Sequence, residues 1–197
     1  QVEDDASIRA GCSGEARTNL ALLEAARAAN PDAVILYKPH PDVEAGLRDG
    51  HVSPERAARL SDAVLSGVDA ATALSAVQEV WTLTSATGFE ALIRGLPVTC
   101  LGAPFYAGWG LTDDRAPVPP RRSVARPSPA ALVHAALIAY PRYRDPVSGL
   151  PCPVEVVLDR LEEGLPPRRG PVNRALGKGQ GWLAGHAWLW RRGFGRT

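Results

Sequence analysis

The sequence predicts an α/β fold built on a doubly wound, mainly parallel sheet. A short, wholly apolar run with β-branched residues stands at 33–37 (AVILY), and a mainly apolar run stands at 97–101 (PVTCL). Such runs are typical of strands that are buried on both faces of a parallel sheet. Stretches with helical apolar spacing separate them, and strands that alternate with helices at this spacing favour the doubly wound arrangement.

The first elements can be followed along the chain. Residues 1–11 are acidic, and we predict a loop there. Ser13 is a suitable N-cap for an Ala- and Leu-rich helix that starts near Ala16 and runs to Ala29. Pro31 ends this helix, because the residue before a proline disfavours helical geometry. The apolar strand at 33–37 follows.

The alternation then continues to about residue 101. The expected elements are a short strand at 63–65, a helix at 69–77, a strand at 79–83, a helix at 89–94 capped by Gly95, and a strand at 97–101. Residues 102–129 are rich in Gly, Pro and Arg and predict irregular structure. Helices at 129–140 and 154–163 form a C-terminal helical extension. We therefore predict one domain over 1–165 and a flexible, irregular Pro-, Arg- and Trp-rich tail over 166–197.

Composition narrows the functional classes. The 197 residues carry a formal net charge of +1, which gives no reason to expect a nucleic-acid partner. The three cysteines, Cys12, Cys100 and Cys152, are far apart and fit neither a disulfide framework nor a zinc site, so we expect core thiols in a reducing, cytoplasmic compartment. No metal-ligand constellation is evident. Because Met is absent and the chain opens in a motif-like stretch, we expect a piece of a longer polypeptide whose preceding strand is missing.

The first candidate site follows the strand at 33–37. In an open parallel sheet, ligands bind beyond the carboxyl ends of the strands. Here Lys38, His40 and Pro41 stand in a loop that two prolines stiffen. A lysine beside an imidazole in a rigid loop suits a phosphate or carboxylate. A capped loop with a solvated histidine is the alternative, and both interpretations stay open.

The second candidate site lies between a strand and a helix. Ser85, Thr87 and the backbone of Gly88 stand at the helix entrance, where free N–H groups and the helix dipole favour an anion. Glu90, which we place in the first turn, suits the hydroxyls of a ribose. The alternative is an ordinary capping box formed by Thr87 and Glu90.

Two further stretches carry candidate residues. Tyr106 and Trp109 lie in a glycine-rich loop after the strand at 97–101, where aromatic rings could pack on a base or a sugar; a structural plug is the alternative. Near the start, Asp4 and Asp5 are carboxylates of the kind that serve glycosyl transfer as nucleophile or acid/base, although acidic stretches are often simply solvated.

Together these stretches resemble the KpsC/LipA-type capsular polysaccharide biosynthesis proteins, which are retaining β-Kdo (3-deoxy-D-manno-octulosonic acid) transferases. The resemblance covers roughly residues 1–160. The strings that carry it are QVEDDAS, YKPHPDV, TSATGFEALIRGLPVTCLGAPFYAGWGLTDD, the pair Arg121-Arg122, and YPRYRDP.

The resemblance implies a C-terminal Rossmann-like half of a GT-B-like glycosyltransferase module, with the other, N-terminal half absent. It implies CMP-β-Kdo as donor substrate, no separate cofactor, and a glycolipid acceptor in the synthesis of the capsule linker. The implied location is the cytoplasm, peripheral at the inner membrane and near the capsule export machinery. The Arg and Trp residues of the tail suit a membrane surface, with a disordered terminus as the alternative.

The resemblance also implies residue roles. His40 would contact the cytidylate phosphate, and Thr84 and Ser85 would lie on the same nucleotide. Gln1 and Asp5 match a Q-x-x-x-D element, in which Asp5 would attack the anomeric carbon, with Asp4 as the near alternative. The implied mechanism is retention by double displacement: a carboxylate takes the sugar, CMP leaves, and the acceptor hydroxyl displaces the carboxylate. A non-catalytic CMP-sugar-binding or scaffold module and a transferase for another CMP-linked acidic sugar are the competing hypotheses.

Overall fold

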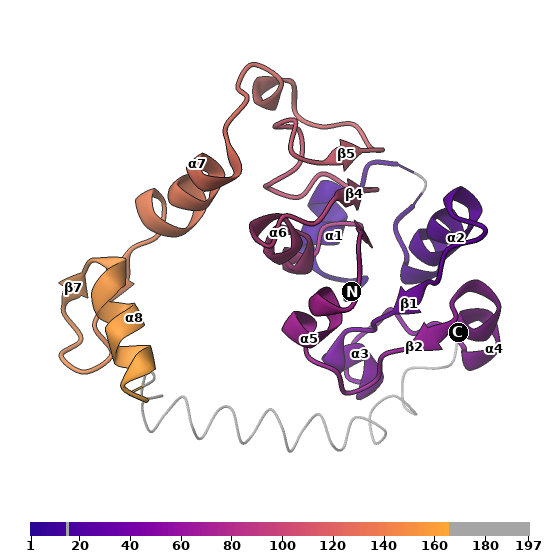
Figure 1. Ribbon diagram of the computed structural model, residues 1–197, viewed down its shortest axis with the longest axis horizontal. Helices are drawn as coiled ribbons and strands as arrows, with labels where there is room; N and C mark the ends of the chain where they lie inside the picture. The colour runs from indigo at the N-terminus through magenta and orange to yellow at the C-terminus, as the bar shows by residue number, and fades with distance from the viewer. Residues whose placement is uncertain (15, 166–197) are drawn as a thin grey trace, which may run out of the picture. The chain divides into compact units, whose positions relative to one another are not determined.

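The computed structural model describes residues 1–14 and 16–165, which belong to two compact units (Figure 1). The first unit spans Gln1–Val133 and the second begins at His134. The predicted tail at 166–197 lies outside the described residues, so the domain boundary at 165 stays a prediction. Across the described ranges, no helix combines the length and the apolar character that crossing a bilayer would need.

The first unit is a mixed α/β structure with parallel strands. β1 (Leu36–Tyr37) pairs in parallel with β2 (Ala63–Val64). β3 (Val80–Thr82) pairs in parallel with β4 (Val98–Cys100), which in turn pairs in parallel with β5 (Asp113–Asp114). The predicted parallel pairing is confirmed. The strands nevertheless form two small sheets and not one continuous sheet, because β1 and β3 are not hydrogen-bonded to each other.

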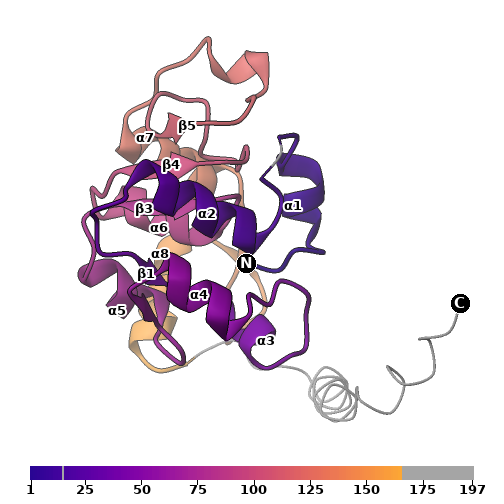
Figure 2. The ribbon, with the colours of Figure 1, turned by 90° about the vertical axis from the view of Figure 1, so that its right-hand side faces the viewer.

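Short helices connect these strands. They are α1 (Ala6–Gly11), α2 (Asn19–Ala29), α3 (Pro41–Glu44), α4 (Pro54–Leu60), α5 (Ala70–Ser75), α6 (Ala86–Ile93), the 3-10 turn η1 (Pro120–Arg122) and α7 (Pro129–Val133). α2 packs against α4 and β3, while α6 packs against β3, β4 and α7 (Figure 2).

The predicted loop at 1–11 is wrong, because its second half is the helix α1. The Asp5 carboxylate accepts a hydrogen bond from the Ser7 backbone N–H at 2.8 Å and caps this helix. The next helix begins later than predicted. Its N-cap is Thr18, whose hydroxyl accepts from the Ala21 N–H at 3.1 Å, so the predicted cap at Ser13 is also wrong.

The strand predicted at 33–37 is shorter and less buried than expected. Only Leu36 and Tyr37 are paired, and Val34 is 76% exposed. The expectation of a strand buried on both faces is wrong, since Leu36 and Tyr37 are both only partly buried. The other strands predicted before residue 102, at 63–65, 79–83 and 97–101, are confirmed.

The helix predicted at 89–94 starts earlier than expected, at Ala86, because Ser85 is its cap. Its predicted stop is confirmed, since Gly95 has φ +76° and takes the left-handed conformation that follows many helices. The helix predicted at 69–77 is confirmed as α5. The segment 102–129 is mostly irregular as predicted, but it contains β5 and η1.

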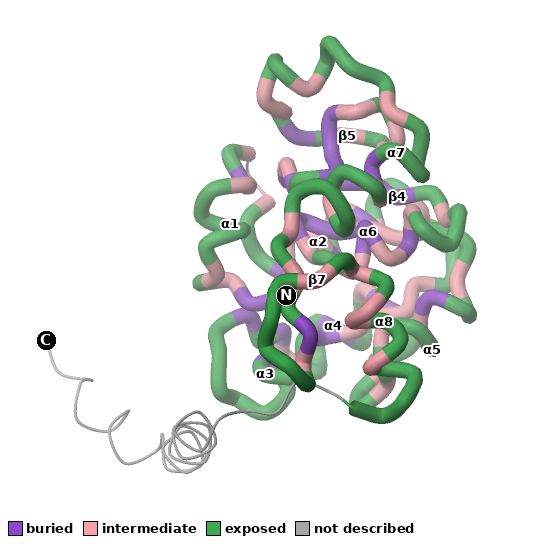
Figure 3. Tube along the Cα trace, turned by 90° about the vertical axis from the view of Figure 1, so that its left-hand side faces the viewer, coloured by how far each residue is buried: buried purple, intermediate pink, exposed green. Residues whose placement is uncertain are grey.

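The core of the first unit surrounds β4 and α6, where buried stretches are concentrated (Figure 3). Leu83, Cys100 and Tyr106 are each 0% exposed. All three cysteines are free thiols, and Cys12 and Cys100 are buried as the sequence predicted. Burial raises the pKa of the Cys100 thiol to about 12, so this group is a packing element and not a reactive thiolate.

The second unit is small. It contains η2 (His134–Ala139), an antiparallel pair of β6 (Tyr143–Arg144) and β7 (Pro151–Cys152), and α8 (Val154–Glu162). The helical segment predicted at 129–140 is confirmed to Ala139, although from His134 its hydrogen bonding is that of a π-helix and not of an α-helix. The helix predicted at 154–163 is confirmed.

Asp145 organises the turn between β6 and β7. Its carboxylate accepts from the Val147 N–H at 3.0 Å, from the Ser148 hydroxyl at 2.7 Å and from Arg160 Nε at 3.2 Å. These bonds, that of Val147 first, lower the pKa of Asp145 to about 2. The carboxylate is therefore ionised at neutral pH and ties α8 to the β6–β7 turn.

Candidate functional site

The N-terminal loop and the loop after β3 meet at the carboxyl ends of the strands. The Gln1 side-chain oxygen accepts a hydrogen bond from the Thr84 backbone N–H at 2.9 Å. The Thr84 hydroxyl donates to the Ser7 hydroxyl at 3.2 Å. Two of the predicted site segments, 83 residues apart in sequence at Gln1 and Thr84, are thus joined directly.

Asn19 anchors this loop from inside, although the sequence analysis did not single it out. It is 1% exposed, and its Nδ2 donates to the backbone oxygens of Gln1 at 2.6 Å and of Gly50 at 2.8 Å. Its backbone N–H donates to the Glu3 carboxylate at 2.6 Å. Gly50 has φ +127°, and a Cβ there would lie 2.6 Å from Asn19 Nδ2, so this crossing requires glycine. A local sequence pattern cannot reveal hydrogen bonds between residues this far apart in the sequence.

Both candidate carboxylates are already engaged. Asp4 accepts from Arg48 Nη2 at 2.8 Å and from Arg48 Nε at 3.1 Å. Asp5 caps α1, and the hydrogen bonds from the Ser7 N–H and hydroxyl hold its pKa below the ordinary value. Asp5 is therefore ionised at neutral pH, as a nucleophilic carboxylate must be. Its role in catalysis remains a prediction.

His40 lies directly beyond β1 and caps α3. Its Nδ1 accepts from the Asp42 backbone N–H at 3.2 Å, and Pro41 occupies the first helical position. An Nδ1 that accepts carries no proton, so the neutral imidazole bears its proton on Nε2 and can donate from there. The side chain is 43% exposed, and no residue in the described ranges hydrogen-bonds Nε2. Lys38 lies two residues earlier, with Nζ 3.4 Å from the Pro39 oxygen.

The entrance of α6 differs from both sequence interpretations. Ser85 is the N-cap, and its hydroxyl accepts from the Thr87 N–H at 3.2 Å, so the capping box of Thr87 and Glu90 is wrong. The Gly88 N–H donates to the Ser85 oxygen at 3.1 Å. Glu90 consequently lies in the second turn, with its carboxylate 4.0 Å from Arg94. A phosphate at these amides, as predicted, would have to replace the bonds to Ser85.

The aromatic loop, which carries Tyr106 and Trp109, packs against the segment that follows β3. Tyr106 is 0% exposed, and its hydroxyl donates to the Ser85 backbone oxygen. The structure therefore favours a plug for this residue, and the predicted contact between its ring and a sugar is not available in this conformation. Trp109 is half-buried; its indole N–H donates to the Phe105 oxygen at 2.8 Å, and the Arg122 guanidinium lies 5.9 Å from its ring centre.

Gly88 is the point where Tyr106 approaches the helix. A Cβ at Gly88 would collide with the Tyr106 hydroxyl and would lie 2.8 Å from Tyr106 Cζ and 3.1 Å from Thr82 Cγ2. We expect Gly88→Ala to lower the free energy of unfolding by about 1–3 kcal/mol, because these buried neighbours have no room to move. Chemical denaturation would measure this loss.

The matched control for that change is Gly14→Ala, which places its Cβ in open space. It should leave stability unchanged or raise it slightly. Combining Gly88→Ala with Tyr106→Phe should cost less than the sum of the two single changes, since removing the hydroxyl relieves the tightest contact. Additive losses would place the strain elsewhere.

No group of three or more His, Cys, Asp or Glu side chains suited to a metal ion occurs in the ranges 1–14 and 16–165.

The family described as "Capsule polysaccharide biosynthesis protein" matches residues 1–143. This chain belongs to that family. The match contains the N-terminal loop, the loop after β1, the loop after β3 and the aromatic loop, so every predicted site residue lies inside it. The resemblance inferred from the sequence motifs is confirmed.

Individual relatives agree with the family assignment. The chain is 54% identical over 146 residues to the capsule polysaccharide modification protein LipA of Neisseria meningitidis serogroup B, covering 74% of this chain and 20% of LipA. It is 47% identical over 143 residues to the lipopolysaccharide-processing protein LpsZ of Rhizobium meliloti, covering 73% of this chain and 32% of LpsZ. The chain thus spans only a fifth to a third of these relatives.

Solved structures of the family share the fold. Thermosulfurimonas dismutans KpsC, titled a beta Kdo 2,7 transferase, superposes with a TM-score of 0.72 at 42% identity over 82% of this chain and 50% of that chain. A second KpsC structure from this organism, titled a beta Kdo 2,4 transferase, gives a TM-score of 0.69 at 33% identity over 82% of this chain and 49% of that chain. The chain thus corresponds to about half of each.

Proposed function

We propose that this chain is the donor-binding half of a glycosyltransferase that moves Kdo from CMP-β-Kdo to a glycolipid acceptor in capsule linker synthesis. The observation that carries the proposal is the bond between the Gln1 side chain and the Thr84 N–H. It places the Q-x-x-x-D loop beside the loop after β3, so a sugar and its nucleotide could be held by adjacent segments. Both similar KpsC structures are Kdo transferases by name, which supports Kdo as the transferred sugar.

In this proposal the histidine and the lysine after β1 hold the donor phosphate. His40 donates from Nε2 to a phosphate oxygen, and Lys38 adds a positive charge two residues away. Both interactions strengthen as negative charge develops on the departing CMP, which lowers the barrier. The rigid Pro39–Pro41 loop holds the imidazole in place before the donor arrives, so binding costs little conformational entropy.

In this proposal Asp5 is the nucleophile. Its ionised oxygen attacks the anomeric carbon of Kdo, the bond to CMP breaks, and the acceptor hydroxyl then displaces the carboxylate with retention of configuration. Gln1 and Thr84 keep this loop against the strand ends. The acceptor-side half of a GT-B module, the inner-membrane surface and the capsule export machinery are the proposed partners.

His40→Ala is expected to weaken CMP binding at least tenfold, because a hydrogen bond to a charged group contributes about 1.5 kcal/mol or more. Calorimetric titration of the full chain with CMP, with UMP as the competing nucleotide, measures the change. Selective binding of CMP by the wild-type chain is the first requirement.

The matched control is Arg59→Ala. Arg59 is in the last turn of α4, which leads into the start of β2, so it lies at the sheet edge opposite the strand carboxyl ends. Its loss removes a surface charge without touching the proposed site, and CMP affinity should not change. Equal CMP affinity for wild type and His40→Ala would remove His40 from the site.

A further inference from the structure

Arg48 joins the loop after α3 to the N-terminal loop, although the sequence analysis did not single it out. Its Nη2 and Nε both donate to Oδ1 of Asp4, at 2.8 and 3.1 Å. The hydrogen bond to Asp4 raises the pKa of Arg48 above its ordinary value, and the charges of Asp5 and Asp42 contribute as well. Arg48 is therefore a permanent cation that lies near both candidate nucleophiles.

Main-chain bonds hold Arg48 and His40 in one folded segment. The Arg48 N–H donates to the Asp42 oxygen at 3.2 Å, and the Asp42 N–H donates to His40 Nδ1 at 3.2 Å. On the other side of Arg48, the Asp49 oxygen accepts from the Glu3 N–H at 3.0 Å. The proposed phosphate ligand, the arginine and the N-terminal loop thus belong to one hydrogen-bonded assembly.

The outer edge of the Arg48 guanidinium is open. A guanidinium carries five N–H groups, and the bonds to Asp4 use one on Nε and one on Nη2. Within the part of the chain that the structure describes, no oxygen accepts a hydrogen bond from Nη1. The edge formed by Nη1 and Nη2 therefore offers two parallel donors, which is the arrangement that binds a carboxylate at both of its oxygens.

Stability alone gives little reason for this arrangement. The side chains of Arg48 and Asp4 are 41% and 48% exposed. An ion pair with this degree of exposure contributes little to the free energy of unfolding, because water screens its charges. An arginine that its backbone holds in place, bonded on one edge and open on the other, is suited to recognise a ligand.

The sugar of the proposed donor brings a negative charge to the carbon at which bonds change. The carboxylate of Kdo is attached directly to its anomeric carbon. In the proposed displacement an oxygen of Asp5 bonds that carbon, and the electron pair of the broken bond leaves with CMP. The ionised Asp5 and the sugar carboxylate repel each other as they approach. A cation in contact with the sugar carboxylate offsets this repulsion.

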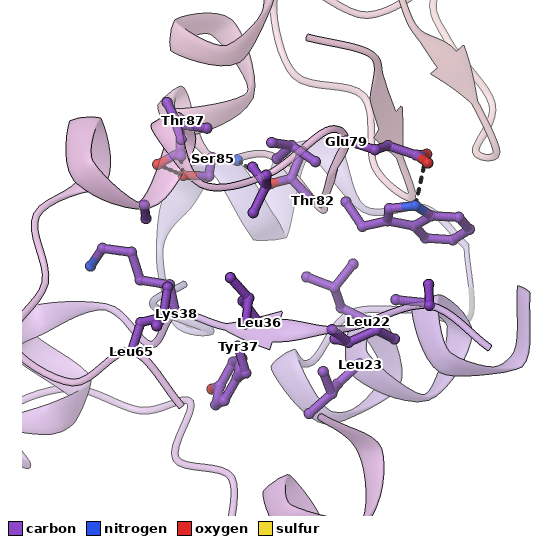
Figure 4. Close-up of a pocket in the computed structure, with 18 of the residues that line it drawn as sticks. Leu22, Leu23, Leu36, Tyr37, Lys38, Leu65, Glu79, Thr82, Ser85 and Thr87 are labelled. Atoms are coloured by element: carbon purple, nitrogen blue, oxygen red, sulfur yellow. Dashed lines mark hydrogen bonds between the residues drawn. The ribbon is translucent and has the colours of Figure 1, made fainter. Parts of the chain in front are cut away.

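The other two cations near the site are less suited to this contact. Lys38 lies at the carboxyl end of β1, and Figure 4 shows it across a groove from Ser85 and Thr87, on the side of the proposed nucleotide contacts. Lys38 therefore suits the phosphate. Arg9 lies exposed in the last turn of α1, and its guanidinium makes no hydrogen bond to either loop within residues 1–14 and 16–165.

We propose that Arg48 binds the carboxylate of the transferred sugar through its Nη1–Nη2 edge, and so selects an acidic sugar and holds its anomeric carbon in front of Asp5. This inference rests on the proposed function, because it assigns the recognition of the sugar within the same site. Asp4 fixes the opposite edge of the guanidinium. Since His40 and Arg48 lie on one folded segment, the phosphate and the carboxylate of the donor are recognised together.

The test compares two donor analogues by calorimetric titration of the full chain. Both carry fluorine on the carbon beside the anomeric carbon, which withdraws electrons and keeps the bond to CMP intact. One is CMP-linked 3-fluoro-Kdo, and the other is its primary amide, in which the carboxylate is replaced by a neutral group. The wild-type chain should bind the acid at least about tenfold more tightly than the amide. Arg48→Ala should bind the two equally and keep its affinity for CMP.

Two further variants separate recognition of the carboxylate from a general effect of charge. Arg48→Lys keeps the charge but loses the two parallel donors, so its preference for the acid should lie between those of wild type and Arg48→Ala. Arg9→Ala removes a neighbouring positive charge and should keep the full preference. If Arg48→Ala fails to fold, the comparison of Arg48→Lys with wild type decides.

Each outcome decides the proposal. Loss of the preference for the acid at Arg48 alone supports it. An Arg48→Ala chain that keeps the preference overturns it, and so does one that loses affinity for CMP and both analogues alike, since Arg48 would then only hold the loops together. Loss of the preference in Arg9→Ala instead assigns the carboxylate to Arg9. Equal binding of acid and amide by the wild-type chain refutes this inference while the proposed function stands, whereas no binding of CMP rejects both.

Discussion

Asp5→Asn is expected to reduce Kdo transfer by at least about 10³-fold while leaving the fold and CMP affinity intact. The reason is that the two functions of Asp5 can be separated by this change. Asparagine caps a helix about as well as aspartate, so its side-chain oxygen can still accept from the Ser7 N–H and α1 remains in place. An amide cannot form the glycosyl ester, so the first displacement is lost.

The measurement is the rate of transfer from CMP-Kdo by a polypeptide that also contains the acceptor-side half, with calorimetric titration of CMP alongside. Asp4→Asn is the matched control, since it removes a neighbouring carboxylate and its ion pair with Arg48. If Asp4→Asn loses transfer and Asp5→Asn keeps it, Asp4 is the nucleophile. If both variants keep the wild-type rate, the N-terminal loop does not supply the attacking group.

Elements with strong local signals were predicted well. The strands β3 and β4 are rich in apolar and β-branched residues, and α6 ends at the glycine that the sequence indicates. α1 was missed because it has only six residues and follows three acidic side chains, which suggested solvated loop. The capping of α1 by Asp5 is local, and a search for Asp followed two residues later by Ser could have found it.

Long-range features were not predictable in this way. The division into two sheets depends on whether β1 and β3 pair with each other, which no local pattern encodes. The sequence left open whether Tyr106 packs on a ligand or serves as a structural plug. Its burial depends on the contact with Gly88, 18 residues earlier, and on the acceptor offered by Ser85. The composition of the loop shows that it is rich in aromatic residues and glycine. It does not show which of its rings faces solvent.

His40 shows where sequence and structure support each other. The two prolines predicted a rigid loop, and the structure adds the tautomer, because Nδ1 is occupied by the Asp42 N–H. The remaining donor, Nε2, is the nitrogen suited to a phosphate. The same bond is the one expected if His40 only caps its loop. Capping uses Nδ1 and the proposed phosphate contact uses Nε2, so the two roles do not compete.

Asn19→Ala is expected to destabilise the chain by about 2–4 kcal/mol, because it removes the donor from two backbone oxygens at once. Those oxygens belong to Gln1 and Gly50, at 2.6 and 2.8 Å, and alanine leaves both without the amide in a site that is 1% exposed to water. Since the Gln1 backbone is then freed, the bond from its side chain to Thr84 should weaken as well. Urea denaturation measures the first effect.

Asn30→Ala is the matched control for this prediction. Asn30 caps the other end of α2, and its Nδ2 donates within the same helix, to the Ala26 oxygen at 3.0 Å. Its loss should cost about 1 kcal/mol or less, because the bond is local and partly exposed. If the proposed donor site is correct, only Asn19→Ala should also lower CMP affinity, through displacement of the N-terminal loop. Equal losses of stability in the two variants would show that the Asn19 amide contributes no more than a local helix bond does, and Gln1 would then be held by other contacts.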